Sequence, residues 1–118
     1  MGMLISILLL SFLISCDSDT LPEPSLDFCD SLQLNELTYA EEISPILEVK
    51  CNNIGCHNAG SSVGDYTNYQ GLIVDLDNGT FTQTVLIDRR MPQQGSPDLT
   101  VEELNMLECW VGNGYPEN

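Results

Sequence analysis

The sequence has very few basic residues. Lys and Arg together number 3 among 118 residues, against 18 Asp and Glu, which gives a formal net charge of −15. A surface of this charge repels nucleic acid and anionic lipid headgroups, so we exclude both as binding partners. The chain also lacks a Ser/His/Asp set, a glycine-rich phosphate loop and a recognisable pair of catalytic carboxylates. We therefore expect no enzymatic activity.

No stretch alternates apolar and polar residues for long enough to predict a β-strand. Helices are predicted instead. A first helix begins at a capping box over 38–41 or at Ser44-Pro45 and runs to Cys51. Two short helices are expected over 67–74 and 81–88, with loops over 58–66 and 90–98. A second capping box at 100–103 opens the last helix, which ends at 112–114. The expected fold class is all-α.

The first 15 residues, MGMLISILLLSFLIS, are almost wholly apolar. This run is shorter than the roughly 20 residues that cross a bilayer as a helix, and it is typical of a signal peptide. Leu13-Ile14-Ser15-Cys16 resembles a bacterial lipobox, whose cysteine is acylated after cleavage. No Lys or Arg precedes the run, so an ordinary secretory signal or an uncleaved anchor is the alternative. We expect 1–15 to be a lipoprotein signal peptide.

The residues after Cys16 are acidic and contain prolines, which is typical of a flexible tether. We expect 16–37 to form a lipidated acidic tether and N-terminal arm, and 38–118 to form one small domain. The lipid on Cys16 would anchor the exported protein to a bacterial membrane, on its periplasmic side or at the cell surface.

Five cysteines are an odd number for an exported protein. Assigning Cys16 to lipid leaves four. Cys51 and Cys56 are close in the sequence, whereas Cys29 and Cys109 lie near opposite ends of the remaining chain. In an oxidising compartment we expect Cys29 and Cys109 to form a disulfide, because the other pair belongs to a separate motif.

The sequence CNNIGCH at 51–57 places two thiols before the chain's single histidine. The usual covalent haem attachment motif is C-x-x-C-H, in which two cysteines add to the vinyl groups and the histidine ligates the iron. Here four residues separate the cysteines, and Gly55 with two asparagines suits a bulged turn that absorbs the additional residues. We expect Cys51 and Cys56 to hold one haem c covalently, with His57 as an axial iron ligand.

A methionine is a common second axial ligand of haem iron in electron carriers. Outside the signal, the methionines are Met91 and Met106. Met91 precedes Pro92 in the irregular loop and is predicted to be this ligand, whereas Met106 fits ordinary packing in the last helix. Arg89 and Arg90 flank Met91. Either they pair with a haem propionate, or they are solvated loop charges.

Several short motifs follow one another along the chain in a characteristic order. They are YAEEISPIL at 39–47, CNNIGCH at 51–57, RMP at 90–92, LTVEE at 99–103 and WVGNG at 110–114. Over residues 39–116 this order resembles small single-haem cytochrome c domains of exported bacterial proteins. The resemblance implies a cytochrome c-like fold, with N- and C-terminal helices beside one haem, and electron transfer to redox partner proteins. Trp110 would pack against the haem ring or against the first helix.

Two other uses of the cysteines remain open. Cys51, Cys56 and His57 would supply three ligands of a zinc site, which needs a fourth from Cys29 or Cys109. Alternatively, Cys51 and Cys56 form a local disulfide. Either would make the chain a non-redox lipoprotein, stabilised by a metal or a disulfide, with a binding or structural role.

Overall fold

The computed structural model describes residues 26–118. The expected signal peptide, Cys16 and most of the tether lie outside the described residues. The elements, in chain order, are helix α1 (Leu26–Ser31), π-helix η1 (Tyr39–Ile43), helix α2 (Ser44–Lys50), helix α3 (Tyr69–Asp77), π-helix η2 (Thr82–Ile87) and helix α4 (Val101–Gly112). No β-strand occurs within 26–118, so the all-α prediction is confirmed.

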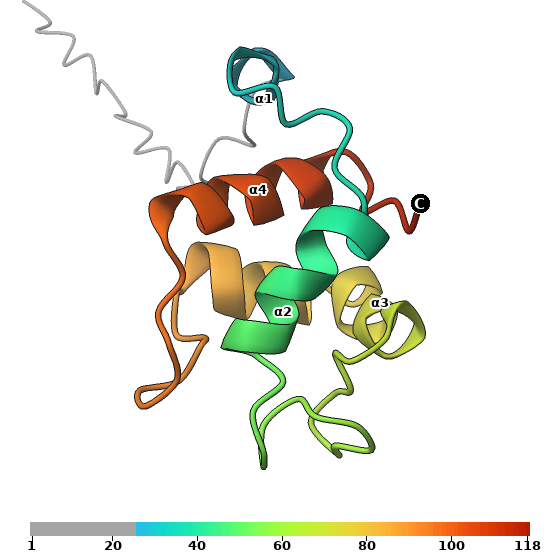
Figure 1. The fold of residues 1–118 in the computed structure, drawn as a ribbon, viewed down its shortest axis with the longest axis vertical. Helices are drawn as coiled ribbons and strands as arrows, with labels where there is room; N and C mark the ends of the chain where they lie inside the picture. The colour runs from blue at the N-terminus through green and yellow to red at the C-terminus, as the bar shows by residue number, and fades with distance from the viewer. Residues whose placement is uncertain (1–25) are drawn as a thin grey trace, which may run out of the picture.

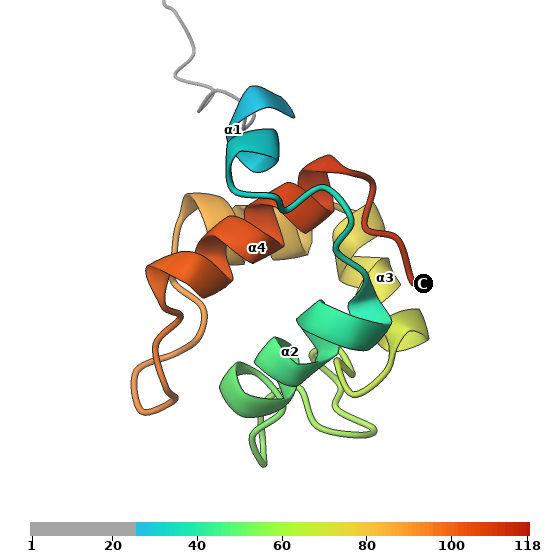
Figure 2. The same cartoon turned by 45° about the horizontal axis from the view of Figure 1, so that its top comes forward.

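The helices pack around one centre and leave the longest loops at one end. In Figures 1 and 2, α4 runs beside η2, and η1 continues directly into α2. The chain that follows α2 forms the loops at the bottom of Figure 1, away from α4. Among residues 26–118, none of the helices has both the length and the apolar character needed to span a membrane.

Polar side chains set the starts of the helices. The Thr100 hydroxyl accepts the Glu103 amide at 3.1 Å, and the Glu103 carboxylate accepts the Thr100 amide at 2.8 Å, which confirms the predicted capping box of α4. Thr38 likewise accepts the Glu41 amide. The carboxylate that reaches back to the Thr38 amide, however, belongs to Glu42, at 2.9 Å. The wider turn of a π-helix brings the fourth residue, rather than the third, under the cap.

The middle helices differ from the predicted ranges. The helix predicted over 67–74 begins at Tyr69, because the Asn68 side chain accepts the Gly71 amide at 2.8 Å and caps it there. Gly71 faces the backbone carbonyl of Asp65, and a Cβ on Gly71 would collide with that oxygen. The helix predicted over 81–88 is the π-helix η2. Residues 58–66 contain no helix, as expected.

A single hydrophobic core joins the helices. Its largest fully buried side chains are Trp110, Phe81, Ile43, Leu47, Leu72, Leu107 and Cys109. Each such side chain contributes about 1.5–3 kcal/mol through burial. The Trp110 Nε1 donates to the Pro116 carbonyl at 3.0 Å, and the Tyr39 amide donates to the same oxygen at 2.9 Å. The C-terminal segment thus closes the core where η1 meets α4.

A disulfide joins α1 to α4. Cys29 and Cys109 are bonded with an S–S distance of 2.09 Å and a Cα–Cα distance of 5.7 Å, and both are buried. This confirms the predicted pairing and makes the segment around Cys29 part of the folded unit. The bond closes a loop across 80 sequence positions. By lowering the entropy of the unfolded chain, a loop of this length adds about 4–5 kcal/mol to the free energy of unfolding.

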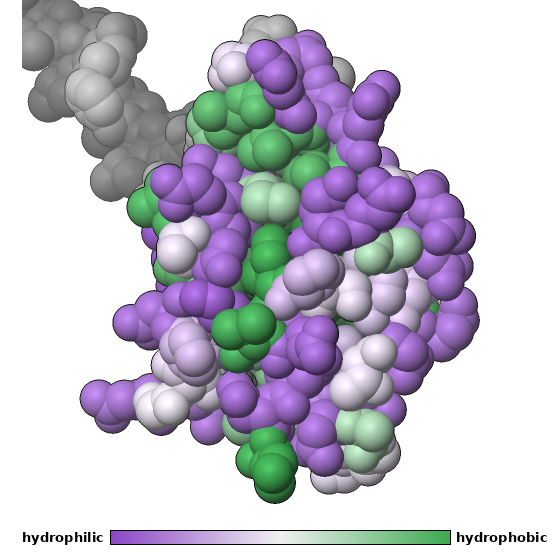
Figure 3. Space-filling model, viewed as in Figure 1, coloured by the Kyte–Doolittle hydropathy of each residue, from purple (hydrophilic) through white to green (hydrophobic). Residues whose placement is uncertain are grey.

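The surface is largely hydrophilic. Figure 3 shows polar side chains over most of one face, with apolar side chains gathered near α1. Each of the three basic residues lies against a carboxylate, in the pairs Lys50–Glu103, Arg89–Glu108 and Arg90–Asp88. The cations are therefore paired within the chain itself.

Removing the disulfide should lower stability without changing the fold. We expect the Cys29→Ala/Cys109→Ala variant to lose up to about 4–5 kcal/mol of unfolding free energy, because the unfolded chain regains its loop entropy. Urea unfolding monitored by circular dichroism measures the loss. Reductant should shift the midpoint of the parent and leave that of the variant unchanged. A parent whose midpoint ignores reductant would contradict the pairing.

Candidate functional site

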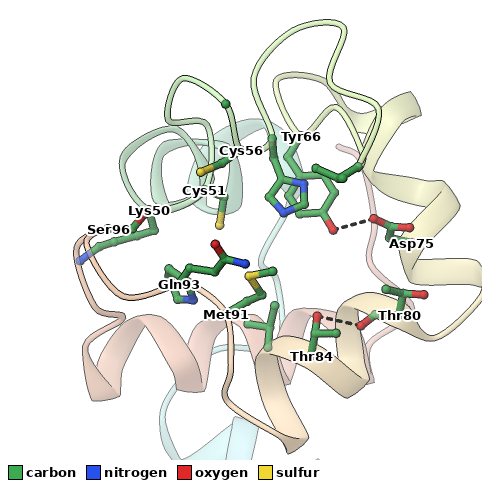
Figure 4. A pocket seen from close by; sticks show the side chains of 15 residues that line it. Lys50, Cys51, Cys56, Tyr66, Asp75, Thr80, Thr84, Met91, Gln93 and Ser96 are labelled. Carbon is green, nitrogen blue, oxygen red and sulfur yellow. Dashed lines mark hydrogen bonds between the residues drawn. The ribbon is translucent and has the colours of Figure 1, made fainter.

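A cavity of about 280 Å³ opens among the loops at the end of α2. Its walls include Cys51, Cys56, His57, Tyr66, Val85 and Met91. Figure 4 shows the Cys51 thiol and the Met91 sulfur directed into this space from opposite walls. The structure therefore brings together the four residues that the sequence predicts as covalent attachment points and axial ligands.

The His57 ring is held by a backbone carbonyl. Its Nδ1 lies 3.1 Å from the carbonyl oxygen of Gly64. Because a carbonyl can only accept, Nδ1 carries the proton of this hydrogen bond, and in the neutral ring the lone pair is on Nε2. A histidine that donates from one nitrogen and leaves the other free is the arrangement found at metal-ligating imidazoles. His57 is thus oriented to ligate a metal through Nε2.

Tyr66 packs flat against His57. The two rings are 3.9 Å apart between centroids and 8° from parallel. Tyr66 is buried, and its hydroxyl donates to an Asp75 carboxylate oxygen at 2.7 Å. Burial, and next this hydrogen bond, raise the pKa of Tyr66, so the phenol stays neutral. The Tyr66 amide also donates to the His57 carbonyl at 3.0 Å, which fixes the two residues relative to each other.

Gly64 lies close to the side chains of Asp75, Tyr66 and His57. Its φ of +107° lies in the region that favours glycine. A Cβ at this position would stand 2.8 Å from an Asp75 carboxylate oxygen, 3.0 Å from the Tyr66 ring and 3.4 Å from His57 Nδ1. A Cβ here would have to shift the Asp75 carboxylate that accepts the Tyr66 hydroxyl. Both the backbone conformation and the surrounding space therefore favour glycine.

The two thiols lie in the turn that follows α2. Cys51 ends the helix, with its amide donating to the Leu47 carbonyl at 2.8 Å, and the His57 amide donates to the Cys51 carbonyl at 3.2 Å. Gly55 has a φ of +83°, as the predicted bulged turn requires. Burial, with the nearby Cys56, raises the pKa of Cys51 to about 12. At neutral pH this thiol is protonated.

Met91 reaches the cavity from the loop between η2 and α4. The amides of Arg90 and Met91 both donate to the Thr84 carbonyl, at 3.1 and 3.2 Å, and so fix the start of this loop to η2. The peptide bond between Met91 and Pro92 is cis. The Met91 side chain is partly buried against the core. Met106, by contrast, is a residue of α4 that packs against the core and does not line the cavity.

The alternative uses of these cysteines gain no support from the geometry. Cys51 and Cys56 are free thiols, so they do not form a local disulfide in this structure. Cys29 and Cys109 are bonded to each other and cannot complete a zinc site. Within 26–118, no three His, Cys, Asp or Glu side chains are grouped closely enough to hold a metal ion.

Arg89, Arg90 and Trp110 were considered as haem contacts, but they do not line the cavity. The side chains of Arg89 and Arg90 are 62% and 64% exposed, and each is directed to a carboxylate at 3.7 Å. Neither lines the cavity, which matches the solvated-charge interpretation. Trp110 is fully buried beside Tyr39, with ring centroids 6.5 Å apart, and is likewise absent from the cavity wall. Of its two predicted positions, it takes the one against the first helix.

Sequence reasoning missed Lys50, Gly64 and Tyr66. Lys50 lines the cavity next to Cys51. Its position as the only lysine, directly before the first cysteine of the motif, was a usable signal. Gly64 and Tyr66 act through loop contacts with His57, and no periodicity or spacing in a loop reveals such contacts.

An alanine at Gly64 should cost more than the same change nearby. Gly60 also has a positive φ, +74°, but a Cβ there meets nothing within 4 Å. We expect Gly64→Ala to lower the unfolding free energy by about 1–3 kcal/mol more than Gly60→Ala, because only the first overpacks its surroundings. Urea titration of both variants measures the difference. Equal losses would show that Gly64 is not confined.

No protein-family model, curated protein or solved structure matches the chain. The donor set is therefore the observation on which a function rests. It consists of an imidazole with a free nitrogen, a methionine sulfur and two thiols around one cavity.

Proposed function

We propose that the chain is a lipid-anchored, monohaem c-type cytochrome that transfers electrons between redox partner proteins. The observation that carries the proposal is the meeting of His57, Met91 and two free thiols on the walls of one cavity. These residues come from segments about 35 positions apart in the sequence. A soft sulfur opposite an imidazole is a typical ligand pair of haem iron in electron carriers.

The chemistry of the donors fits haem c. Cys51 and Cys56 would form the thioether links, and His57 Nε2 and the Met91 sulfur would be the axial ligands. A thioether is uncharged, which suits a buried position such as that of Cys51, where a thiolate is disfavoured. When bound, haem supplies an iron that alternates between the ferric and ferrous states.

The chain's own residues contribute rigidity. The Gly64 carbonyl and the Tyr66 ring restrict His57, and the Thr84 carbonyl fixes the start of the Met91 loop. Ligands that do not move keep the reorganisation on electron transfer small. Met91 would take the coordination position that a substrate would need, so we propose no enzymatic activity.

The finer details of the fold and location belong to the same proposal. The consecutive helices η1 and α2 would together form the N-terminal helix of a cytochrome c-like fold, and α4 would be its C-terminal helix. Lipid on Cys16 would hold the protein at a bacterial membrane, periplasmic or surface-exposed, with 16–37 as the lipidated tether and arm. The net charge of −15 suits redox partners with basic surfaces.

Visible absorbance tests the proposal. Protein made in a host that matures c-type cytochromes should show a Soret band and, after reduction, a sharp α-band. Protein made without that maturation should show neither, because thioether formation needs it. A colourless product from the competent host would contradict the proposal.

The axial role of Met91 has its own test. We expect Met91→Ala to keep the attached haem, since the thioethers remain, and to lose the methionine-to-iron charge-transfer band. Met106→Ala is the matched control, because Met106 is also partly buried but lies outside the cavity. It should retain the band. An unaltered spectrum in Met91→Ala would assign the second ligand to another group.

A further inference from the structure

Lys50 occupies an unusual place for a cation. It is the only lysine of the chain, and its side chain is 11% exposed, whereas those of Arg89 and Arg90 are exposed. It lines the cavity beside Cys51. Its Nζ donates to the Asp98 carbonyl at 2.6 Å and forms an ion pair with Glu103 at 3.1 Å. Charges this far from solvent interact more strongly than exposed pairs.

These contacts join two segments that are distant in the sequence. Glu103 binds Lys50 and, through the same carboxylate, caps α4 at the Thr100 amide. The side-chain Nδ2 of Asn53 donates to the Ser96 hydroxyl at 3.4 Å, which adds a second link between the same segments. The end of α2 and the turn after it are thereby tied to the segment 96–103.

The Lys50 contacts hold the second end of the loop that carries Met91. The first end is fixed by the hydrogen bonds to the Thr84 carbonyl of η2, and the second end is fixed at Asp98, whose carbonyl accepts the Lys50 ammonium. A second hollow of about 180 Å³ is also lined by Met91, together with Leu99 and Leu104. Because Met91 borders two hollows, its position depends on how the loop is fixed.

We propose that Lys50 is a positioning residue: its ion pair with Glu103 and its hydrogen bond to the Asp98 carbonyl keep the Met91 loop closed over the cavity. This inference rests on the proposed haem ligation by Met91. It assigns to Lys50 control over how readily Met91 leaves the iron. Loosening the tie should weaken Met91 as a ligand without changing any group that contacts the iron.

Imidazole competition on the haem-loaded protein tests this role. Added imidazole replaces Met91 on the iron, and loss of the methionine-to-iron charge-transfer band reports its affinity. We expect Glu103→Gln to bind imidazole about tenfold more tightly than the parent, which corresponds to about 1.4 kcal/mol. Glu102→Gln is the matched control, because it makes the same change of charge in the same helical turn. Glu102 is exposed, and the variant should stay within about twofold of the parent.

A second variant separates the loss of the Lys50–Glu103 ion pair from any weakening of the α4 cap. Lys50→Leu removes the ammonium group, adds no second thioether that could bind the iron and leaves the cap intact, and it should also tighten imidazole binding about tenfold or more. The double variant with Glu103→Gln should bind about as Lys50→Leu does, because both changes break the same pair.

The outcomes separate this inference from the function on which it rests. Parent-like affinity in both Glu103→Gln and Lys50→Leu, in a protein that shows the charge-transfer band, would overturn the role of Lys50 alone. An equal shift in Glu102→Gln would overturn it as well, because charge rather than contact would then be the cause. A parent without haem absorbance would overturn the proposed function, and the role of Lys50 with it.

Discussion

The hydrogen bond from His57 Nδ1 to the Gly64 carbonyl is the constraint on which the candidate site depends. It determines the tautomer of the chain's single histidine and leaves Nε2 free. The loop over 58–66 returns the chain so that this carbonyl meets the ring, and Tyr66 then covers the ring's face. Without these contacts the imidazole could rotate, and Nε2 would no longer be held in one orientation relative to the thiols and Met91 on the cavity wall.

The hydrophobic core and the cavity are neighbours that share Cys51, Tyr66 and Val85. The apolar faces of the helices meet around Trp110, and the Cys29–Cys109 disulfide and the C-terminal segment close that core. The cavity borders this core and is lined by η2 and by the loops after α2 and before α4. A chain of this size can therefore keep a stable scaffold while its loops present polar and sulfur-bearing side chains. Lys50 and Glu103 connect these loops to the helix ends.

Much of the fold and part of the site could be predicted because they depend on local or rare signals. The Thr100 capping box follows from residue types three positions apart, and the left-handed Gly55 follows from the turn that it must make. His57 was predicted as a ligand because it follows the cysteine pair, and Met91 because it and Met106 are the methionines outside the expected signal. The structure places both on one cavity, and their role as ligands is still a prediction. The cytochrome c-like architecture is still a prediction, because the helical structure shows only the fold class.

Contacts between distant loops could not be predicted. The Lys50–Glu103 pair and the Tyr66–His57 stack depend on how the loops return, and no spacing encodes this. Glu42 replaced Glu41 in the cap because the first turn is π-helical, a departure that residue types do not signal. Arg90 was considered for a propionate because it neighbours Met91, but its side chain is directed to Asp88 at the surface.

The intact mass of the denatured protein, purified from a host that matures c-type cytochromes, tests the central claim most directly. The account predicts the mass of the processed chain plus one haem, still attached after unfolding, because the links through Cys51 and Cys56 are covalent. A chain without that added mass, or with both thiols open to alkylation after unfolding, would contradict it.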